Sequence, residues 1–456
     1  MERRKIEREI EYSSKSPSQK HEFSIEDEEI ILLTVPPTVY PPREDTELLY
    51  QALQKLRISG GHLVEIGCGS GAISIAMAIA GWRVSAFDIN PLAVAATRGN
   101  ANLAGVDDKV TVEEGGVGEE NWILPYDADV IVWNLPYLES NYPDTLGPIE
   151  EASLSDEPEI GWSKLLLEYA EQHNLNHQVF ILLLNTDLNS KNSPLIWTRK
   201  GWSTRVLSTQ IIGSDTLEVV AFWKPGLGVE PTYIDSTEST MEEARELPSE
   251  GWQRVLARIQ LQGRGRRGSI WHSMEGDLTA SWTIKDQVIN RWTPGLLQVS
   301  LGAIISEALG IELKWPNDLM YQGRKCGGIL LESDTNSNTI RIGIGLNKSK
   351  REIDGVLHLG WDQFYPGKNS QEIFQIVDAS ISSLLEAAAP IPASEPTIWK
   401  EKSWISLGKS LSRGGLVQFN RENVRICGLD KKGELRSLSK EELVKIRDQG
   451  SFFISF

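Results

Sequence analysis

Short apolar runs alternate with helix-like stretches between residues 45 and 223. The runs "HLVEIG", "RVSAFD", "ADVIVWN", "QVFILLLN" and "TLEVVAFW" have the length and apolar content of buried strands. Stretches such as "PLAVAATRGNANLAG" lie between them and predict helices. Because strands that alternate with helices form parallel sheets covered by helices, the pattern predicts an α/β domain.

The pattern changes after residue 223. Pro225, Gly226, Gly228 and Pro231 in "KPGLGVEP" are typical of a linker. The region that follows mixes predicted strands and helices without regular alternation, which indicates an α+β domain. The last stretch, "GKSLSRGGLVQFNRENVRICGLDKKGELRSLS", predicts short strands joined by Gly-rich turns, and we expect a small β-barrel there.

The length of 456 residues exceeds what one hydrophobic core usually supports. The N-terminus is rich in charge and poor in apolar residues, so we expect a frayed arm before the first domain. The expected division is an arm at 1–32, an α/β domain at 33–225, a linker at 226–231, an α+β domain at 232–402 and a barrel at 403–456.

Composition narrows the class of protein. The formal net charge of −17 argues against long duplex nucleic acid, no helix-turn-helix is apparent, and we expect no DNA partner. No apolar run approaches the roughly 18 residues of a membrane span, and no apolar signal-peptide core is present, so we expect a cytoplasmic protein. Cys68, Cys326 and Cys427 lie far apart, which predicts free thiols. His173 and His177 lack an HExxH motif, and we expect no metal cluster of side chains.

A Gly-rich turn follows the first apolar run. "LVEIGCGSGAISIAMA" places Gly67, Gly69 and Gly71 where a strand turns into a helix, so the backbone can approach a cofactor. Asp88 ends the next strand, where its carboxylate can accept hydrogen bonds from two ribose hydroxyls. A dinucleotide fold is the alternative, but its glycines are spaced GxGxxG, whereas these are spaced GxGxG.

A later strand ends in a motif for nitrogen chemistry. Asn134, Leu135, Pro136 and Tyr137 in "VIVWNLPYLES" resemble the (N/D)PP(Y/F) motif of amino-methyltransferases. An amide nitrogen is a poor nucleophile, so it must be held in line with the methyl carbon. An Asn oxygen and a strand carbonyl would accept its hydrogens while an aromatic ring stacks on its plane.

Two further segments, "VYPPREDTELLYQAL" and "DINPLAVAATRGNANLAG", resemble the glutamine-N5 methyltransferases of release factors, most closely the archaeal and eukaryotic branch. The resemblance covers residues 33–224. It implies a Rossmann-like class I methyltransferase domain, S-adenosyl-L-methionine (AdoMet) as cofactor and a peptide release factor as partner. The implied AdoMet contacts are Glu65, Gly67, Cys68, Gly69, Ser70, Gly71, Asp88 and Asn134. The implied acceptor contacts are Asn134, which is also catalytic, Leu135, Pro136 and Tyr137.

This half departs from the family at two positions. Leu135 replaces the first proline of the motif, and Val117 stands where an acidic residue near the adenine is usual. Two alternatives therefore stay open. One is a nucleic-acid adenine methyltransferase, and the other is a non-catalytic module that recruits a carrier protein or senses AdoMet.

A cationic turn lies in the second half of the chain. "QLQGRGRRGSIWHS" places Arg264, Arg266 and Arg267 within a frame of three glycines. The glycines let successive backbone N–H groups turn toward an anion, and the arginines donate charge-assisted hydrogen bonds to phosphate or carboxylate oxygens. The turn therefore predicts an anion-binding loop.

Four ordered segments resemble biotin protein ligases over residues 232–456: "YIDSTESTMEEAREL", "ARIQLQGRGRRGSIWHS", "LKWPNDLMYQGRKCGGILLE" and "IRIGIGLN". The resemblance implies a ligase catalytic α+β domain and a small SH3-like barrel, with ATP, Mg²⁺ and biotin as ligands. Two half-reactions follow from it. The biotin carboxylate attacks the α-phosphate of ATP to give biotinyl-5'-AMP, and a lysine of a biotin carboxyl carrier protein then attacks the acyl carbon.

The family's roles map onto matching residues. Lys325 in "GRKCGG" would bridge the carboxylate and the α-phosphate, because two anions repel each other on approach. The implied catalytic residues are Lys325, Arg264 and Arg266. The implied biotin contacts are Ser239, Thr240, Met241, Gln260, Arg264, Gly265, Arg266, Trp271, Lys325 and Gly328. The implied ATP and Mg²⁺ side consists of Arg267, Lys314, Asn317, Asp318 and Asn347.

Some choices in this half stay open. Met241 stands where many members carry Asn, and Ser236 with Thr237 offers a competing register that the spacing to Ala244 disfavours. A lipoate ligase is the enzymatic alternative, because that family shares the fold and the adenylation chemistry. The oligomeric state, with a dimer among the options, is not indicated by the sequence.

Overall fold

The structure is a computed structural model. It describes residues 17–455 except for 27–28, 137–158, 188–190, 214, 249, 286–290, 335–338, 388–389, 413–415, 421, 440–441 and 448–451. The chain forms two compact units, each described by itself. The first consists of Met1–Trp197, Thr204–Trp223 and Ala388–Pro392, and the second of Thr198–Ser203, Lys224–Ala387 and Ala393–Phe456.

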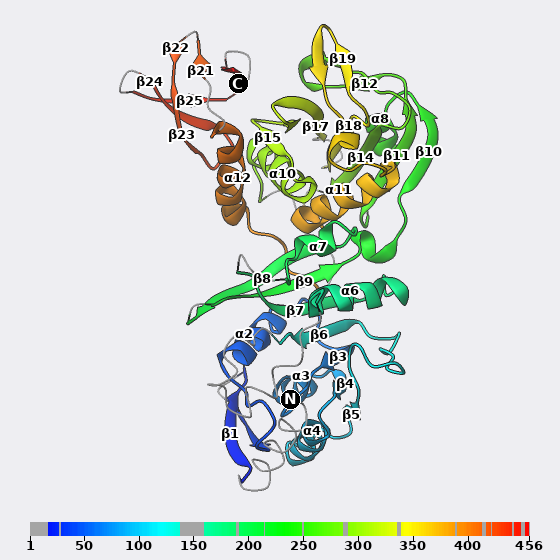
Figure 1. The fold of residues 1–456 in the computed structure, drawn as a ribbon, viewed down its shortest axis with the longest axis vertical. Coiled ribbons are helices and arrows are strands. Elements are labelled where there is room, and N and C mark those ends of the chain that lie inside the picture. Colours follow the sequence, from blue (N-terminus) through cyan, green and yellow to red (C-terminus); the bar gives the residue numbers. More distant parts are fainter. Residues whose placement is uncertain are drawn as a thin grey trace. The chain divides into compact units, whose positions relative to one another are not determined.

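The first unit is built on a seven-stranded sheet of order β5-β4-β3-β6-β7-β9-β8 (Figure 1). Neighbours from β5 to β7 are parallel, and β9 is antiparallel to β7. The elements are β1 (Gln19–Ser24), β2 (Ile30–Val35), α2 (Glu44–Leu53), β3 (His62–Ile66), α3 (Ala72–Ile79), β4 (Arg83–Asp88), α4 (Pro91–Leu103), β5 (Val110–Glu114), β6 (Val130–Asn134), α6 (Trp162–Gln172), β7 (Val179–Asn185), α7 (Leu195–Thr198), β8 (Ser203–Ile212) and β9 (Asp215–Trp223).

The strands and the helix predicted from the apolar runs are confirmed as β3, β4, β6, β7, β9 and α4. Strand β9 departs from the parallel arrangement that the alternation predicts, because it is antiparallel to β7. Only two residues separate the end of β8 from the start of β9, which is too short for the crossover that parallel neighbours require.

Local sequence explains the start of the two helices nearest the Gly-rich turn. Gly71, with a φ of 85°, precedes α3, and a Cβ there would lie 2.9 Å from Thr97 of α4. At α4, the Asn90 side chain accepts a hydrogen bond from the Leu92 N–H at 2.9 Å, and Pro91 occupies the first helical position. The turn and α4 are therefore packed closely together.

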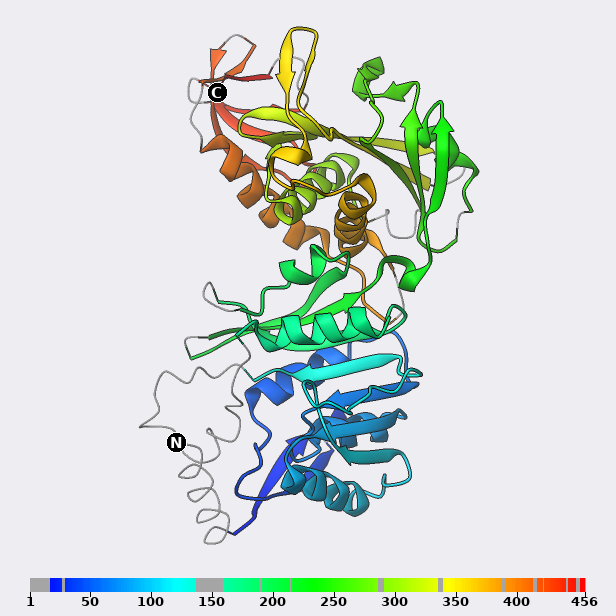
Figure 2. The ribbon, with the colours of Figure 1, turned by 45° about the vertical axis from the view of Figure 1, so that its right-hand side comes forward.

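The second unit contains a seven-stranded sheet of order β10-β11-β14-β18-β17-β16-β15, in which only β10 and β11 pair in parallel. Helices α10 and α11 lie against this sheet (Figure 2) and share its apolar core. The elements are η2 (Pro225–Gly228), β10 (Thr232–Thr237), α8 (Thr240–Glu246), β11 (Gln253–Gln260), β12 (Gly263–Arg264), η3 (Arg266–Gly268), β13 (Ile270–Trp271), β14 (Leu278–Lys285), α10 (Pro294–Leu309), β15 (Glu312–Lys314), β16 (Asp318–Tyr321), β17 (Arg324–Asp334), β18 (Thr339–Leu346), β19 (Arg351–Ile353), β20 (Val356–His358), η4 (Trp361–Gln363), α11 (Ser370–Leu385) and α12 (Pro396–Leu411).

The C-terminal strands form two three-stranded antiparallel sheets, β22-β21-β26 and β23-β24-β25. Helix α12 runs through the expected domain boundary at 402/403, and the strand prediction for residues 408–411 is wrong. Ser403 and Leu407 are buried on one face of this helix, which keeps the segment helical. The strands are β21 (Leu416–Phe419), β22 (Glu422–Asn423), β23 (Arg425–Leu429), β24 (Leu435–Ser439), β25 (Glu442–Ile446) and β26 (Phe452–Ser455).

Asp378 of α11 is a buried carboxylate at the centre of the second unit. It accepts hydrogen bonds from the indole N–H groups of Trp252 and Trp282, each at 2.8 Å, and from Arg254 Nε at 3.0 Å. Asp378 and Arg254 are only 3% and 4% exposed, so this ion pair is shielded from water. The ion pair joins α11 to β11, and the hydrogen bond from Trp282 joins α11 to β14.

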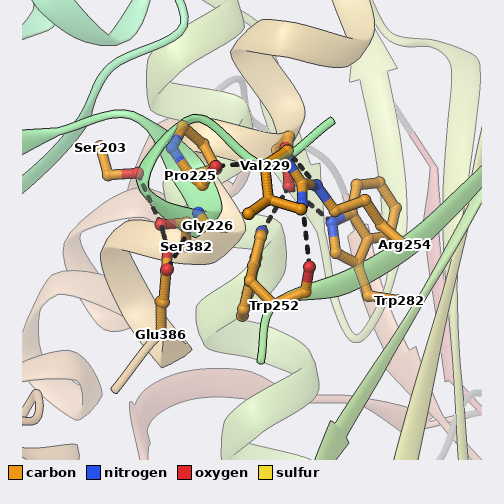
Figure 3. Close-up of polar contacts among 10 residues, drawn as sticks. Ser203, Pro225, Gly226, Val229, Trp252, Arg254, Trp282, Ser382 and Glu386 are labelled. Carbon is orange, nitrogen blue, oxygen red and sulfur yellow. Dashed lines mark hydrogen bonds and ion pairs between the residues drawn. The ribbon is translucent and has the colours of Figure 1, made fainter. Parts of the chain in front are cut away.

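Arg254 also binds the segment expected to be a linker. It donates hydrogen bonds to the carbonyl oxygens of Pro225 at 3.2 Å and Val229 at 2.5 Å, as Figure 3 shows. The Gly226 N–H donates to Glu386 of α11 at 2.9 Å. Residues 225–229 are therefore held within the second unit by three hydrogen bonds.

Other sequence expectations concern cysteines and membrane spans. Cys68, Cys326 and Cys427 are free thiols, as predicted, and the first two are buried. Within the described part of the chain, no helix is long and apolar enough to cross a membrane.

Replacing Asp378 with Asn should destabilise the second unit by about 3–5 kcal/mol, because Arg254 then stays buried without a counter-charge. Hydrogen exchange of β11 and β14 amides would show the loss of protection. The matched control is Asp235→Asn, which removes the carboxylate of an exposed pair with Arg258 and should change protection little. Equal protection in all three proteins would contradict this role.

Candidate functional sites

A cavity in the first unit lies at the carboxyl ends of β3, β4 and β6. Of the predicted AdoMet contacts, only Gly71 does not line it. Leu135, Pro136 and Val117 also line it, and Tyr137 lies outside the described residues. The predicted residues in its wall are Glu65, Gly67, Cys68, Gly69, Ser70, Asp88, Asn134, Leu135 and Pro136.

The Gly-rich turn is held from two sides. Asp88 accepts hydrogen bonds from the N–H groups of Gly69 and Asn90, each at 2.9 Å. From α4, the Thr97 hydroxyl donates to the Gly69 carbonyl at 3.0 Å, and the Asn100 amide donates to the Ser70 carbonyl at 2.9 Å. The sequence pattern did not indicate Thr97 and Asn100, because their partners lie on a distant segment.

Glu65 is a buried carboxyl in the wall of this cavity. Its pKa is raised to about 8, mainly by burial and to a smaller extent by the nearby Asp88, against the lowering effect of the hydrogen bonds to Ser74. The side chain is therefore mainly protonated at neutral pH in the free protein.

Asp45 orients the side chain of Asn134. The Asn134 Nδ2 donates to Asp45 Oδ2 at 2.9 Å, and Asp45 Oδ1 accepts from the Thr46 N–H at 2.7 Å. Because Nδ2 is engaged, the amide oxygen of Asn134 is the atom left over, and it is buried without a hydrogen-bond partner among the described residues. Asp45 and Asn134 both line the cavity. Asp45 lies in the segment "VYPPREDTELL", which resembles the methyltransferase family, but the sequence pattern alone does not single out this residue.

Two more buried polar atoms around this cavity lack partners in the part of the chain that the structure describes. They are Thr38 Oγ1 and Trp162 Nε1. A buried polar atom without a partner typically costs about 1–3 kcal/mol. Such atoms in a cavity wall indicate a polar ligand. No sequence signal singled out Thr38 or Trp162.

A second cavity lies in the second unit, between the cationic loop and the sheet. All ten predicted biotin contacts line it, as do Arg267, Asn317 and Asp318. Lys314 and Asn347, predicted on the ATP side, do not line it. The sequence missed Ser269, Gly343 and Gly345, which also form its wall. The biotin contacts are Ser239, Thr240, Met241, Gln260, Arg264, Gly265, Arg266, Trp271, Lys325 and Gly328.

One end of this cavity is fixed by a chain of hydrogen bonds. The Ser281 hydroxyl donates to Thr240 Oγ1 at 2.8 Å, and the Thr240 hydroxyl and N–H donate to Gln260 Oε1 at 3.0 and 2.9 Å. Ser239 Oγ and Trp271 Nε1 are buried here without partners among the described residues. This end therefore offers two free polar atoms to a ligand.

The Trp271 ring needs glycine beneath it. A Cβ at Gly345 would collide with the indole, and a Cβ at Gly328 would lie 3.7 Å from it. The ring can therefore lie against the sheet and cover the cavity with an apolar surface.

The cations of this cavity have acidic or polar neighbours. Lys325 Nζ lies 2.6 Å from Asp318 Oδ1, and Arg266 donates to Asn317 Oδ1 at 3.2 Å. Arg264 pairs with Glu242 of α8, and its Nη2 lies 3.9 Å from Glu332 Oε2. These contacts place the cationic groups in fixed positions around the cavity.

Two family models match the chain. The "Biotin/lipoate A/B protein ligase family" matches residues 232–349, and "Ribosomal protein L11 methyltransferase (PrmA)" matches residues 43–136. These segments carry most of the walls of the second and the first cavity, respectively.

Curated relatives match the same two segments. The "Bifunctional ligase/repressor BirA" of Bacillus subtilis is 34% identical over 140 residues, which are 28% of this chain and 43% of that protein. The "Ribosomal protein L11 methyltransferase" of Anoxybacillus flavithermus is 40% identical over 91 residues, which are 20% of this chain and 28% of that protein. The chain thus spans less than half the length of each of these relatives.

A solved biotin protein ligase from Aquifex aeolicus, in complex with biotin and ATP, is similar with 25% identity and a TM-score of 0.41, over 50% of this chain and 98% of that chain. In one polypeptide, the protein carries a segment similar to biotin and lipoate protein ligases at residues 232–349 and a segment similar to the ribosomal protein L11 methyltransferases at residues 43–136.

Proposed function

We propose that the second unit attaches biotin to a lysine of a biotin carboxyl carrier protein through biotinyl-5'-AMP. The observation that carries the proposal is a single cavity whose wall combines two kinds of group. Among the described residues, Ser239 Oγ and Trp271 Nε1 are buried there without partners, beside the apolar Trp271 ring. Arg266, Arg267 and Lys325 line the same cavity. The uncharged polar atoms and the ring suit a ureido ring, and the cations suit a carboxylate that meets a triphosphate.

In the first half-reaction a carboxylate oxygen of biotin bonds to the α-phosphorus of ATP, and the bond to the pyrophosphate breaks. Lys325 would leave Asp318 and bridge the two anions, which removes their repulsion. The oxygens of Asp318 and Asn317 line the same cavity and suit Mg²⁺ that arrives with ATP. The ion would neutralise phosphate charge.

In the second half-reaction the carrier lysine nitrogen bonds to the acyl carbon, and AMP leaves. The cationic loop would cover the adenylate until the carrier arrives, which keeps water away from the mixed anhydride. We further propose that strands β21–β26 form the SH3-like barrel that accompanies such a ligase. The expected boundary at 402/403 falls inside α12, so the barrel would begin after that helix.

We propose that the first unit is a Rossmann-like class I methyltransferase that transfers the methyl group of AdoMet to a glutamine of a protein, with a release factor as the substrate. Its central parallel strands, the Gly-rich turn at their carboxyl ends and the free oxygen of Asn134 support this. The acceptor nitrogen would bond to the methyl carbon as the carbon–sulfur bond breaks, and the nitrogen would release one proton. Asn134 Oδ1 would accept a hydrogen bond from an N–H of the acceptor and so hold the nitrogen in place. Asp45 holds the Asn134 amide in that orientation.

The charge of the cavity supports AdoMet and a protein acceptor over nucleic acid. Asp45 and Asp88 line it as carboxylates, Glu65 is mainly protonated, and none of the described lining residues is basic. A sulfonium cation suits such a wall, whereas a phosphate backbone requires basic side chains.

Lys325→Ala should lower biotinyl-AMP formation by about 100-fold or more, because a charge-stabilising donor is lost from the reacting centre. Arg266→Ala should release the adenylate faster, since the loop loses its hydrogen bond to Asn317. Chromatography of labelled biotinyl-AMP, bound and free, measures both effects. Lys350→Ala, an exposed lysine away from the cavity, is the control. Unchanged synthesis and retention in both variants would refute these roles.

Biotin, and not lipoate, should raise the apparent stability of the protein, because only a ligand that binds the native state does so. At a concentration of 100 times Kd the gain is about 2.7 kcal/mol. Thermal shift assays with each vitamin measure it. A larger shift with lipoate would replace the biotin assignment with the lipoate alternative.

Asn134→Ala should lower methyl transfer from labelled AdoMet to a release-factor glutamine peptide by about 100-fold, since the acceptor nitrogen loses its hydrogen-bond acceptor. Asp45→Ala should lower kcat about tenfold with unchanged AdoMet affinity, because one hydrogen bond that orients Asn134 is lost. Glu47→Ala, an exposed carboxylate on α2, is the control. Ribosomal protein L11 serves as a competing substrate. AdoMet binding without transfer to the release-factor peptide would count against that substrate.

A further inference from the structure

Trp162 places an unused hydrogen-bond donor in the wall of the methyltransferase cavity. It is the first residue of α6, and its Nε1 is buried without a partner in the described chain. Its ring meets that of Trp133 edge to face, with 5.7 Å between the centroids. Trp133 directly precedes Asn134 at the end of β6, and Trp133, Asn134 and Trp162 all line this cavity.

Besides the Thr38 hydroxyl, the described residues leave one acceptor and one donor without a partner in the wall of this cavity. The acceptor is Asn134 Oδ1, and the donor is the indole N–H of Trp162. A primary carboxamide has N–H groups and a carbonyl oxygen on one planar group, so it can satisfy both. An alkylammonium group has only N–H donors and would leave the indole N–H without a partner.

We propose that Trp162 determines acceptor specificity by donating its indole N–H to the carbonyl oxygen of a primary carboxamide, while Asn134 Oδ1 accepts an N–H of the same amide. The proposal rests on the proposed methyl transfer. A hydrogen bond to the carbonyl draws electrons away from the amide nitrogen, so it does not make that nitrogen more nucleophilic. Trp162 is therefore a positioning residue, and its effect should fall on KM rather than on kcat.

Adenine also has an amino group beside a ring nitrogen that accepts hydrogen bonds. The lining of the cavity disfavours a nucleic acid, because none of the described lining residues is basic and the phosphates would have no cationic partner there. DNA that contains adenine is therefore included as a competing substrate in the test.

The test compares the full-length protein with Trp162→Phe, which keeps an aromatic ring against Trp133 and removes the N–H. The KM for a glutamine peptide should rise about three- to tenfold, as expected for one lost hydrogen bond, with kcat and AdoMet affinity nearly unchanged. The preference for a glutamine peptide over the matched lysine peptide should fall by the same factor. Trp162→His, which retains a ring N–H, should restore part of it.

Trp122→Phe is the matched control. Trp122 Nε1 is also buried without a partner, and its ring packs against Phe87, but it does not line the cavity. An equal KM for wild type and Trp162→Phe, or an equal rise in Trp122→Phe, would overturn the role of Trp162. If Trp162→Phe loses AdoMet binding, it is misfolded and Trp162→His replaces it in the test. A preference of Trp162→His for the glutamine peptide over the lysine peptide that equals the wild-type preference would then contradict the role of Trp162, because histidine should restore the hydrogen bond only in part.

Failure of the proposed function has a different result. If the wild-type protein binds AdoMet and methylates DNA adenine or a lysine peptide, but no glutamine peptide, the amide assignment falls together with the role of Trp162. If wild type methylates the glutamine peptide and only the variant comparison fails, the methyltransferase assignment stands and the inference about Trp162 falls.

Discussion

The buried carboxylate of Asp378 is the charge on which the second unit depends. A carboxylate removed from water requires partners, and here two indole N–H groups and a guanidinium supply them. Trp282 lies on β14, Arg254 lies on β11, and Trp252 directly precedes β11. Strand β11 ends at Gln260, shortly before the cationic loop, and β14 carries Ser281, which contacts Thr240. The same carboxylate therefore fixes both strands that lead to the ligand cavity.

The two sites share one physical design. Each wall combines polar groups that already have partners with a few buried polar atoms that have none. In the second unit, Thr240 and Gln260 are engaged with each other while Ser239 Oγ is not. In the first unit, Asp45 accepts a hydrogen bond from Asn134 Nδ2, while Asn134 Oδ1 has no partner among the described residues. The groups that have partners fix the positions of the side chains in the wall. The atoms without partners determine which hydrogen-bonding groups a ligand must have.

The sequence predicted the parts of this protein that are encoded locally. Continuous apolar runs marked the strands of the first sheet because those strands are buried on both faces. The glycines of the turn and of the cationic loop marked the two cavities. Asp45 and Asn134 lie 89 residues apart, and their contact exists only after the strands have assembled. The sequence predicted a strand from residue 408, where α12 continues to Leu411, for a similar reason. The burial of Leu407 that holds the end of this helix depends on tertiary packing and not on local propensity.

Helix α12 has a consequence for how the chain can be divided. Its Ser403 hydroxyl lies 3.1 Å from the Ser300 hydroxyl of α10, and Leu407 is almost fully buried in the core. A polypeptide that ended at residue 402 would lose α12 after its second turn. The apolar surface of α10 that the rest of α12 covers would then be exposed to solvent. Such a fragment would tend to self-associate. An expression fragment of the catalytic core should therefore keep α12 whole, and with it the first residues of the C-terminal sheets.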